Sequence, residues 1–384
     1  MSEYQYFEFL AIDRPLTTEE IGILRSISNR ARITPVSFVN HYNWGDFKGD
    51  PDKLMQLYFD AHVYVADWMT AVFMLRLPID TLSKETVDAF QASDMLAFKA
   101  TKTHWIITWC LEESENYDRF GQEGGEEWMA RLAPVREELL QGDIRSLYIG
   151  WLAGVTQGTI EADQMEPLPV SGLNKLTPSQ QALAEFLEVD PDLLAGSGMG
   201  REKLQHETVS QAQMEKWTDD LPEKEIRTVI KQILDGRSLQ AERAVKNRFA
   251  VWCRSLQKGM DNAPLRRVEE LWKNAEKAEK IRLEQEAHGQ NQEAIRHRNE
   301  REAYLKNLSK NFPEMWKSVE TTVKRGSGLA YDEACKAIVD ISDAHALAGS
   351  PSRFRQELET FMAANVRRKA LIQRLRDAGI WENT

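Results

Sequence analysis

The fold of this chain is indicated first by residues 33–77, which read ITPVSFVNHYNWGDFKGDPDKLMQLYFDAHVYVADWMTAVFMLRL. Apolar side chains fall at even spacing over residues 33–42, and this alternation predicts a strand that lies near a sheet edge. Residues 71–77 form a near-continuous apolar run that Pro78 ends, as expected of a central strand covered on both faces. The stretch therefore predicts two strands joined by a loop and a helix.

The helix between these two strands has a well-marked start. Asp50 is a suitable N-cap residue, and Pro51 suits the first helical position. The apolar stripe that follows continues to Ala61, but residues 63–65 could already be extended. The start of the helix is therefore predicted, whereas its end stays open.

The rest of the first half adds further strands and helices. Residues 4–12 predict a strand, and Thr17 with Glu20 forms a capping box for the helix that follows. Later elements are a short helix near 85–90, a hairpin of strands at 95–101 and 104–111, and helices at 128–140 and 143–153. This order predicts an α+β domain with a mixed or antiparallel sheet, either ferredoxin-like or a related sandwich.

The second half reads as helix and turn. Residues 265–308 are the longest helical candidate, and a weak pattern at 288–292 predicts either one solvated helix with a kink or two helices. Further helices are predicted at 222–234, 239–256, 316–323, 331–347 and 354–375. The predicted organisation is an α+β domain at 1–165, a linker at 166–176, a helical domain at 177–310 and a C-terminal helical module at 311–384.

Charge is distributed unevenly along the chain. The formal net charge is −11. Residues 1–200 hold 31 acidic and 15 basic residues, a balance of −16, whereas residues 201–384 hold 29 and 34, a balance of +5. A nucleic-acid-binding coat over the whole surface is therefore excluded, while a local basic patch on the second half stays open.

The sequence lacks the features of a membrane or exported protein. No apolar run approaches the roughly 18 residues that span a bilayer, and the acidic start lacks the basic flank of a secretory signal. Cys110, Cys253 and Cys335 lie far apart, which fits neither a disulfide framework nor a zinc cluster. We therefore expect a cytoplasmic protein without membrane contact, cofactor or metal.

The loop at residues 41–50 contains the residues that most resemble a binding site. We predict Trp44, Asp46, Phe47 and Lys48 as binding residues, because aromatic and charged side chains in a glycine-containing loop suit recognition. The alternative is that the two aromatic side chains pack into the core.

A catalytic or metal site near this loop is the weaker interpretation. His41, Asp46, Asp60 and His62 are ligand or acid–base residue types, but their spacing matches no ligand motif. On the predicted helix, Asp60 and His62 would point to different faces. No complete catalytic motif occurs elsewhere in the sequence, so we predict no catalytic or metal-binding residue.

The terminal helices carry a second candidate surface, because basic residues are frequent there. The basic positions are Arg353, Arg355, Arg367, Arg368, Lys369, Arg374 and Arg376. We predict Arg367, Arg368, Lys369 and Arg374 as phosphate-contacting residues if nucleic acid is bound. Acidic residues such as Glu357 lie among them, which indicates instead a solvated or protein-binding face.

Two regions resemble known bacterial sequences. The final 70 or so residues contain a recognisable pattern, which consists of Trp316, Val319, Tyr331-Asp332-Glu333-Ala334, Ile338, Asp340, Ile341, Asp343, the segment from Phe354 to Phe361, the basic run Arg367-Arg368-Lys369, and Leu375-Arg376-Asp377-Ala378-Gly379. This pattern resembles the C-terminal helical segment of bacterial SWIM zinc-finger proteins. The zinc finger of that family is missing here, so neither zinc nor nucleic-acid binding is implied. The Trp44-Gly45-Asp46-Phe47-Lys48-Gly49 and Leu75-Arg76-Leu77-Pro78 signatures are similar to those of an uncharacterised bacterial family, which implies no activity.

The sequence as a whole favours a non-catalytic bacterial adaptor that binds another protein. The first alternative is a nucleic-acid-associated regulator that uses the basic terminal helices. The second alternative is an enzyme of unknown type centred on the 41–50 loop. The oligomeric state stays open.

Overall fold

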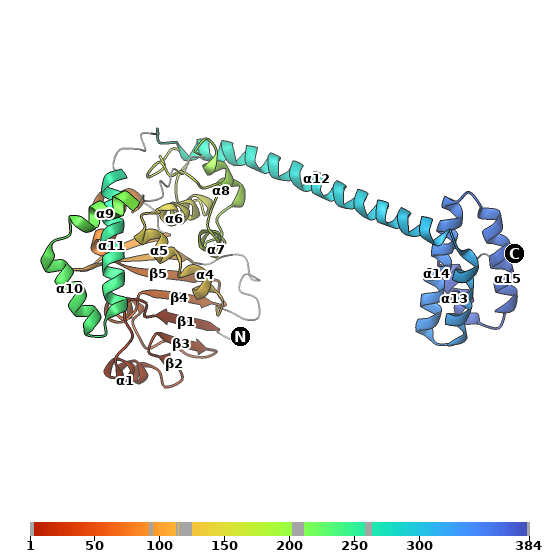
Figure 1. Cartoon of the computed structure of the whole chain (residues 1–384), viewed down its shortest axis with the longest axis horizontal. Helices are drawn as coiled ribbons and strands as arrows, with labels where there is room; N and C mark the ends of the chain where they lie inside the picture. Colours follow the sequence, from red (N-terminus) through yellow and green to blue (C-terminus); the bar gives the residue numbers. More distant parts are fainter. Residues whose placement is uncertain are drawn as a thin grey trace. The chain divides into compact units, whose positions relative to one another are not determined.

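The computed structural model describes residues 4–91, 95–112, 114, 125–201, 211–257 and 263–381 (Figure 1). The chain divides into two compact units, Met1–Ile281 and Arg282–Thr384. The first unit contains a β-sheet with helices, and the second is helical. The predicted α+β region followed by an all-α region is therefore confirmed.

Seven strands form one sheet in the described part of the first unit. In chain order they are β1 (Gln5–Leu10), β2 (Arg32–Thr34), β3 (Ser37–Tyr42), β4 (Ala61–Ala66), β5 (Ala71–Pro78), β6 (Leu96–Ala100) and β7 (His104–Leu111). Their order across the sheet is β2-β3-β1-β4-β5-β7-β6, and every strand pair that the structure describes is antiparallel. The sheet is therefore of the antiparallel kind that the sequence allowed for the α+β domain.

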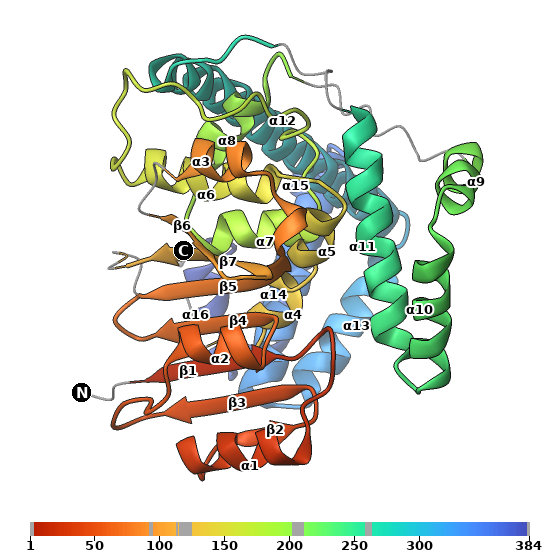
Figure 2. The ribbon, with the colours of Figure 1, turned by 90° about the vertical axis from the view of Figure 1, so that its left-hand side faces the viewer.

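Helices pack on both faces of this sheet (Figure 2). On one face, α1 (Thr18–Ile27) and α2 (Pro51–Leu57) cover a core that includes Phe9, Phe38 and Met55. On the other face lie α4 (Trp128–Leu132), α5 (Val135–Leu140) and α6 (Arg145–Thr156), with α7 (Pro178–Phe186) packed on α4 and α6. Between β5 and β6, the chain forms the short helix η1 (Ile79–Thr81) and α3 (Lys84–Phe90). β5 is buried along most of its length, as predicted for a central strand.

Local sequence signals set the starts of the two helices on the first face. The Thr17 side chain accepts from the Glu20 N–H, and the Glu20 carboxylate accepts from the Thr17 N–H. The Asp50 carboxylate accepts from the Lys53 N–H. Both predicted N-caps are therefore confirmed.

The structure differs from the sequence interpretation after α2. The helix ends at Leu57, and Ala61–Ala66 forms β4 between β1 and β5. The Asp60 N–H donates to the Leu10 carbonyl oxygen, so the chain has already left the helix there. In addition, the predicted strand at 33–42 is divided into β2 and β3 by a tight turn at Pro35.

The predicted linker at 166–176 lies inside the first unit. It carries buried Glu166, Val170 and Leu173, so its proline-rich composition marks a packed loop. After α7, the structure describes α8 (Pro191–Gly198), α9 (Gln211–Asp219), α10 (Glu223–Leu234) and α11 (Ser238–Gln257) before the long helix. Residues 1–281 therefore belong to one compact unit in place of the two predicted domains.

The long helix α12 (Val268–Leu308) is continuous over 41 residues, and the weak pattern at 288–292 does not divide it. Ion pairs one turn apart, such as Lys273–Glu269 and Lys306–Glu302, lie along its exposed surface. Such pairs support a solvated helix. Within the described residues, no helix combines the length and apolarity needed to cross a membrane.

The second unit is built around α14 (Gly328–Leu347). α13 (Phe312–Lys324), α15 (Pro351–Ala364) and α16 (Lys369–Asp377) all pack against it. The predicted single helix at 354–375 is thus two helices. The Arg368 side chain holds the turn between them, since it donates to the Val323 carbonyl oxygen and the Tyr331 hydroxyl.

Candidate functional site

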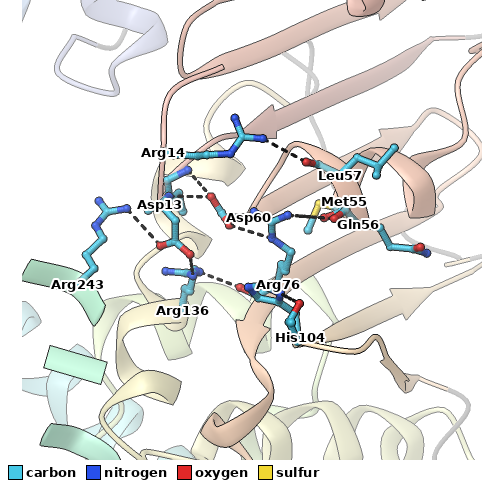
Figure 3. Close-up of polar contacts among 12 residues, drawn as sticks. Asp13, Arg14, Met55, Gln56, Leu57, Asp60, Arg76, His104, Arg136 and Arg243 are labelled. Atoms are coloured by element: carbon cyan, nitrogen blue, oxygen red, sulfur yellow. Dashed lines mark hydrogen bonds and ion pairs between the residues drawn. The ribbon is translucent and has the colours of Figure 1, made fainter. Parts of the chain in front are cut away.

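An extensive buried polar network surrounds Asp60, at the junction of α2 and β4 (Figure 3). One carboxylate oxygen of Asp60 accepts from the N–H groups of Ile12 and Asp13, at 2.6 and 2.8 Å. The other accepts from Arg76 Nε and Nη2, at 3.1 and 2.7 Å. This carboxylate therefore ties the end of β1 and the end of α2 to β5.

The Arg76 side chain extends this network in two directions. Its Nη1 donates to the carbonyl oxygens of Met55 and Gln56, which are left over at the C-terminal end of α2. Its own carbonyl oxygen accepts from Arg136 Nε at 2.9 Å, and Arg136 Nη2 donates to Asp13 at 2.8 Å. We call Asp13, Asp60, Arg76 and Arg136 the Asp60 cluster.

The charges in the Asp60 cluster are matched. Burial alone would raise the pKa of Asp60, but the positive charges of Arg76 and Arg136 outweigh it and leave that pKa below its usual value. All the acceptor positions of the carboxylate are used, so it cannot accept a substrate proton without breaking these bonds. The cluster therefore has the chemistry of a structural junction.

The histidines and acids that could have formed a catalytic or metal site do not converge. His62 lies on β4, is buried against Phe9 at 3.8 Å between ring centroids, and its Nδ1 contacts the Glu8 carbonyl oxygen. His41 lies on β3, beside Tyr6 and Glu126. Within the residues that the structure describes, no group of three or more His, Cys, Asp and Glu is placed to hold a metal ion.

Asp60 and His62 also correct a sequence interpretation. The predicted helix included both residues, whereas Asp60 directly precedes β4 and His62 lies on it. The two side chains have separate partners: Asp60 accepts from Ile12, Asp13 and Arg76, and His62 Nδ1 contacts the Glu8 carbonyl oxygen. The enzyme alternative thus loses the residues on which it was based.

A serine–histidine–carboxylate arrangement occurs in the second unit. His345 contacts Ser350 Oγ at 2.9 Å and Glu357 Oε2 at 3.2 Å. The imidazole is completely buried and stacks on Phe312 at 3.6 Å. Glu357 is shared with Trp316 and Arg353, so this arrangement joins α13, α14 and α15.

The 41–50 loop divides its two aromatic side chains between core and solvent. Phe47 stacks on Phe7 at 4.7 Å between ring centroids and packs near Phe38. Trp44 is 69% exposed, and Asp46 and Lys48 are exposed beside it. Of the predicted binding residues in this loop, Phe47 therefore belongs to the core, and Trp44, Asp46 and Lys48 belong to the surface.

The predicted basic surface is divided in a similar way. Arg368 is used inside the second unit, as described above, and Arg374 pairs with Asp332 at 2.5 Å. Arg367 and Lys369 are exposed. Half of the four predicted phosphate contacts thus already have partners within the fold.

Helix α10 presents an apolar stripe that the sequence analysis did not single out. Ile226, Ile230 and Ile233 are 40%, 50% and 49% exposed, and Leu234 is 80% exposed. The structure describes α10 in full, and none of its side chains is buried. A signal was present in the sequence, since isoleucines at i, i+4 and i+7 fall on one side of a helix.

α10 packs on the protein through the side that carries its least exposed residues, Glu225, Val229 and Gln232, and the three isoleucines lie about 100° around the helix from that side. α10 lies along α11, and Glu225 of α10 forms an ion pair with Arg248 of α11. α11 is fixed to the first unit through buried Ala241 and through Arg243, which reaches Asp13 (Figure 3). The isoleucine stripe of α10 (Ile226, Ile230 and Ile233) is therefore held outward by a packed helix.

Comparisons with known proteins identified no relative of this chain. The resemblances of the two regions to bacterial families accordingly stay predictions. Scans against protein-family models, curated proteins and solved structures each found no match to this chain.

Proposed function

We propose that the chain is a non-catalytic adaptor that binds another protein through the isoleucine stripe of α10. The observation that carries this proposal is the exposure of Ile226, Ile230 and Ile233 on a helix that buries no side chain of its own. Contiguous exposed apolar surface is uncommon on monomeric proteins unless it serves an interaction.

The spacing of the stripe suits a partner that offers an apolar groove. Amphipathic helices bind such grooves through side chains at i, i+3 or i+4, and i+7. Each half-exposed isoleucine would contribute roughly 1 kcal/mol when the groove covers it, because full burial contributes about 1.5–3 kcal/mol. Three of them supply a central apolar contact of the kind that dominates interface energetics.

Competing functions receive less support. The Asp60 carboxylate has its acceptor positions occupied and His345 is completely buried, so neither of these groups is poised for acid–base or nucleophilic work. A nucleic-acid role would depend on Arg367 and Lys369, because Arg368 and Arg374 are engaged elsewhere.

The proposal is tested by affinity capture with matched baits of the full chain. The baits are the wild type, Ile230→Asp in the stripe, and Leu57→Asp as a control at an isolated exposed leucine of α2. We expect a stoichiometric partner that the wild type and Leu57→Asp recover and Ile230→Asp does not. That partner is then purified, and its affinity for the three baits is measured.

Two outcomes would overturn this proposal. One is a purified partner that binds Ile230→Asp as tightly as the wild type. The other is a wild-type chain that forms a dimer which Ile230→Asp dissolves, since the stripe would then be covered by a second copy. Light scattering on the purified full chain distinguishes the second outcome.

A further inference from the structure

A second exposed feature lies at the end of the sheet where β1 begins. Trp44 follows the end of β3, and Trp68 follows the end of β4. Tyr42 and Ala66, the last residues of those strands, pair with the same residue of β1, Gln5. The strand ends that carry the two tryptophans are therefore two strand spacings apart, roughly 10 Å.

Both loops are fixed to the start of β1. Gln5 Nε2 donates to the Gly45 carbonyl oxygen at 3.3 Å, next to Trp44. In the other loop, the Asp67 N–H donates to the Tyr4 carbonyl oxygen, and the Tyr4 N–H donates to the Asp67 carboxylate, both at 3.0 Å. The two tryptophans thus stand on anchored loops.

The turn that carries Trp68 has an unusual backbone. Met69 has a φ of 70° and is buried, which turns its side chain into the protein. Trp68, its neighbour, is 44% exposed. Non-glycine residues in the left-handed region cost free energy and occur often at functional sites. The sequence analysis passed over Trp68, although an aromatic residue in a tight turn is itself a signal.

Acidic side chains surround this pair. Exposed Asp46 and Asp67 lie in the same two loops, and Glu112 and Glu126 lie on the neighbouring segments. Asp67 and Asp46 both act on the hydroxyl of Tyr64, because burial first, and then these two charges, raise the pKa of Tyr64 to about 12. Lys48 is the basic residue of the 43–49 loop. The exposed apolar surface is therefore set in a negative field.

We propose that this surface, formed by Trp44, Trp68, Asp46 and Asp67, binds a cationic peptide segment of another protein. We call it the tryptophan end. An arginine or lysine side chain lies over an indole ring, and its charge is matched by Asp46 or Asp67. Cations within about 6 Å of a tryptophan ring centroid are attracted by the negative face of the ring.

Charge favours this occupant over the alternatives. An anionic ligand such as a nucleic acid would be repelled by the acids of both loops. A purely apolar segment would leave those acids without a role. The tryptophan end is separate from the α10 stripe, so the inference does not depend on the proposed function.

The test uses the full chain and a short fluorescent peptide that alternates arginine and serine. We expect it to bind at low salt, whereas a peptide that alternates glutamate and serine does not. Replacing both Trp44 and Trp68 by alanine should weaken binding by about five- to thirtyfold, because two exposed cation–π contacts are lost. Asp46→Asn with Asp67→Asn should weaken binding and reduce its salt dependence.

Matched controls separate specific binding from general attraction to an acidic protein. Trp272→Ala removes an exposed tryptophan of α12, and Asp219→Asn with Asp220→Asn removes two exposed acids at the C-terminal end of α9. Both controls should bind the arginine peptide like the wild type. Ile230→Asp should also bind normally, which keeps this test apart from that of the α10 stripe.

Three results would overturn the inference. They are an arginine peptide that fails to bind at low salt, a glutamate peptide that binds equally well, and binding that the Trp44 and Trp68 replacements leave unchanged.

Discussion

The Asp60 cluster and the tryptophan end lie in the same unit and both contain two aspartates, but they differ in how their side chains are used. In the cluster, Asp60 and Arg76 are buried and bonded to each other and to the backbone. At the tryptophan end, Trp44 and Asp46 face solvent. The difference teaches that the buried charges here are used within the fold, while the residues proposed to bind a partner remain available at the surface.

The largest effect is expected when the Asp60 cluster is broken. Arg76→Met leaves the Asp60 carboxylate buried without its cation, which should lower the free energy of unfolding by about 3–5 kcal/mol. Because the chain has two units, the effect is best measured as lost hydrogen-exchange protection of β1 and β4 amides in the full chain.

A surface ion pair provides the control for that measurement. Arg227→Met breaks the Arg227–Glu223 pair, whose side chains are 72% and 78% exposed. The change in stability should stay below about 0.5 kcal/mol. Equal effects of Arg76→Met and Arg227→Met would remove the distinction between the buried cluster and the surface.

A smaller loss of stability is expected from a change at Phe47, which lies in the loop that contains both a core residue and the exposed Trp44. Phe47→Ala removes a ring that stacks on Phe7 and should cost about 2 kcal/mol, less than a fully buried phenylalanine would. Thermal unfolding followed by circular dichroism measures it. If Phe47→Ala leaves the stability unchanged, the whole loop, Phe47 included, is exposed to solvent.

The stability of the fold is expected to depend on pH through His62, which is buried like the Asp60 cluster. Burial lowers the pKa of His62 to about 4, below the ordinary value near 6.5. The unfolded state then binds more protons between these values, so stability is complete above about pH 6.5 and is lost as the pH falls towards 4.

Between pH 7.5 and 5.5 this loss should be on the order of 1 kcal/mol. Denaturant unfolding at the two pH values measures it. His62→Leu cannot take up the proton, so its stability should change less over the same range. A variant with the full wild-type pH dependence would show that another group is responsible.

The smallest effect on stability is expected at the tryptophan end. Trp44→Ala removes an exposed side chain and should change the free energy of unfolding by less than about 0.5 kcal/mol. The same thermal measurement as for Phe47→Ala applies. A loss as large as that of Phe47→Ala would place Trp44 in the core in solution and would contradict the comparison.

The sequence allowed the local features of the fold to be predicted. The Thr17 capping box, the Asp50 N-cap, the buried strand before Pro78 and the β6–β7 hairpin are all confirmed. Each of these depends on residues close together in the chain. The exposed position of Trp44 could not be predicted, because the same loop pattern fits a core or a surface side chain.

Features that depend on distant residues were missed. β4 follows a helix without a break in its apolar pattern, and it becomes a strand because β1 and β5 flank it. The donors that hold Asp60 come from Ile12 and Asp13, nearly 50 residues earlier. The placement of Trp44 and Trp68 at the same end of the sheet likewise depends on the register of β3 and β4 against β1.

The position of β1 also has a consequence for biosynthesis. β1 lies between β3 and β4, so both of its edges are paired only after Ala66 has been made. Leu10 and Ala66 are 56 residues apart, which takes roughly 3–11 s at ribosomal rates of about 5–20 residues per second. During that interval, an aromatic strand (Gln5-Tyr6-Phe7-Glu8-Phe9-Leu10) leaves the ribosome with a free edge. Until the loop that carries Trp68 emerges, this strand therefore keeps an edge that is open to aggregation and to chaperone binding.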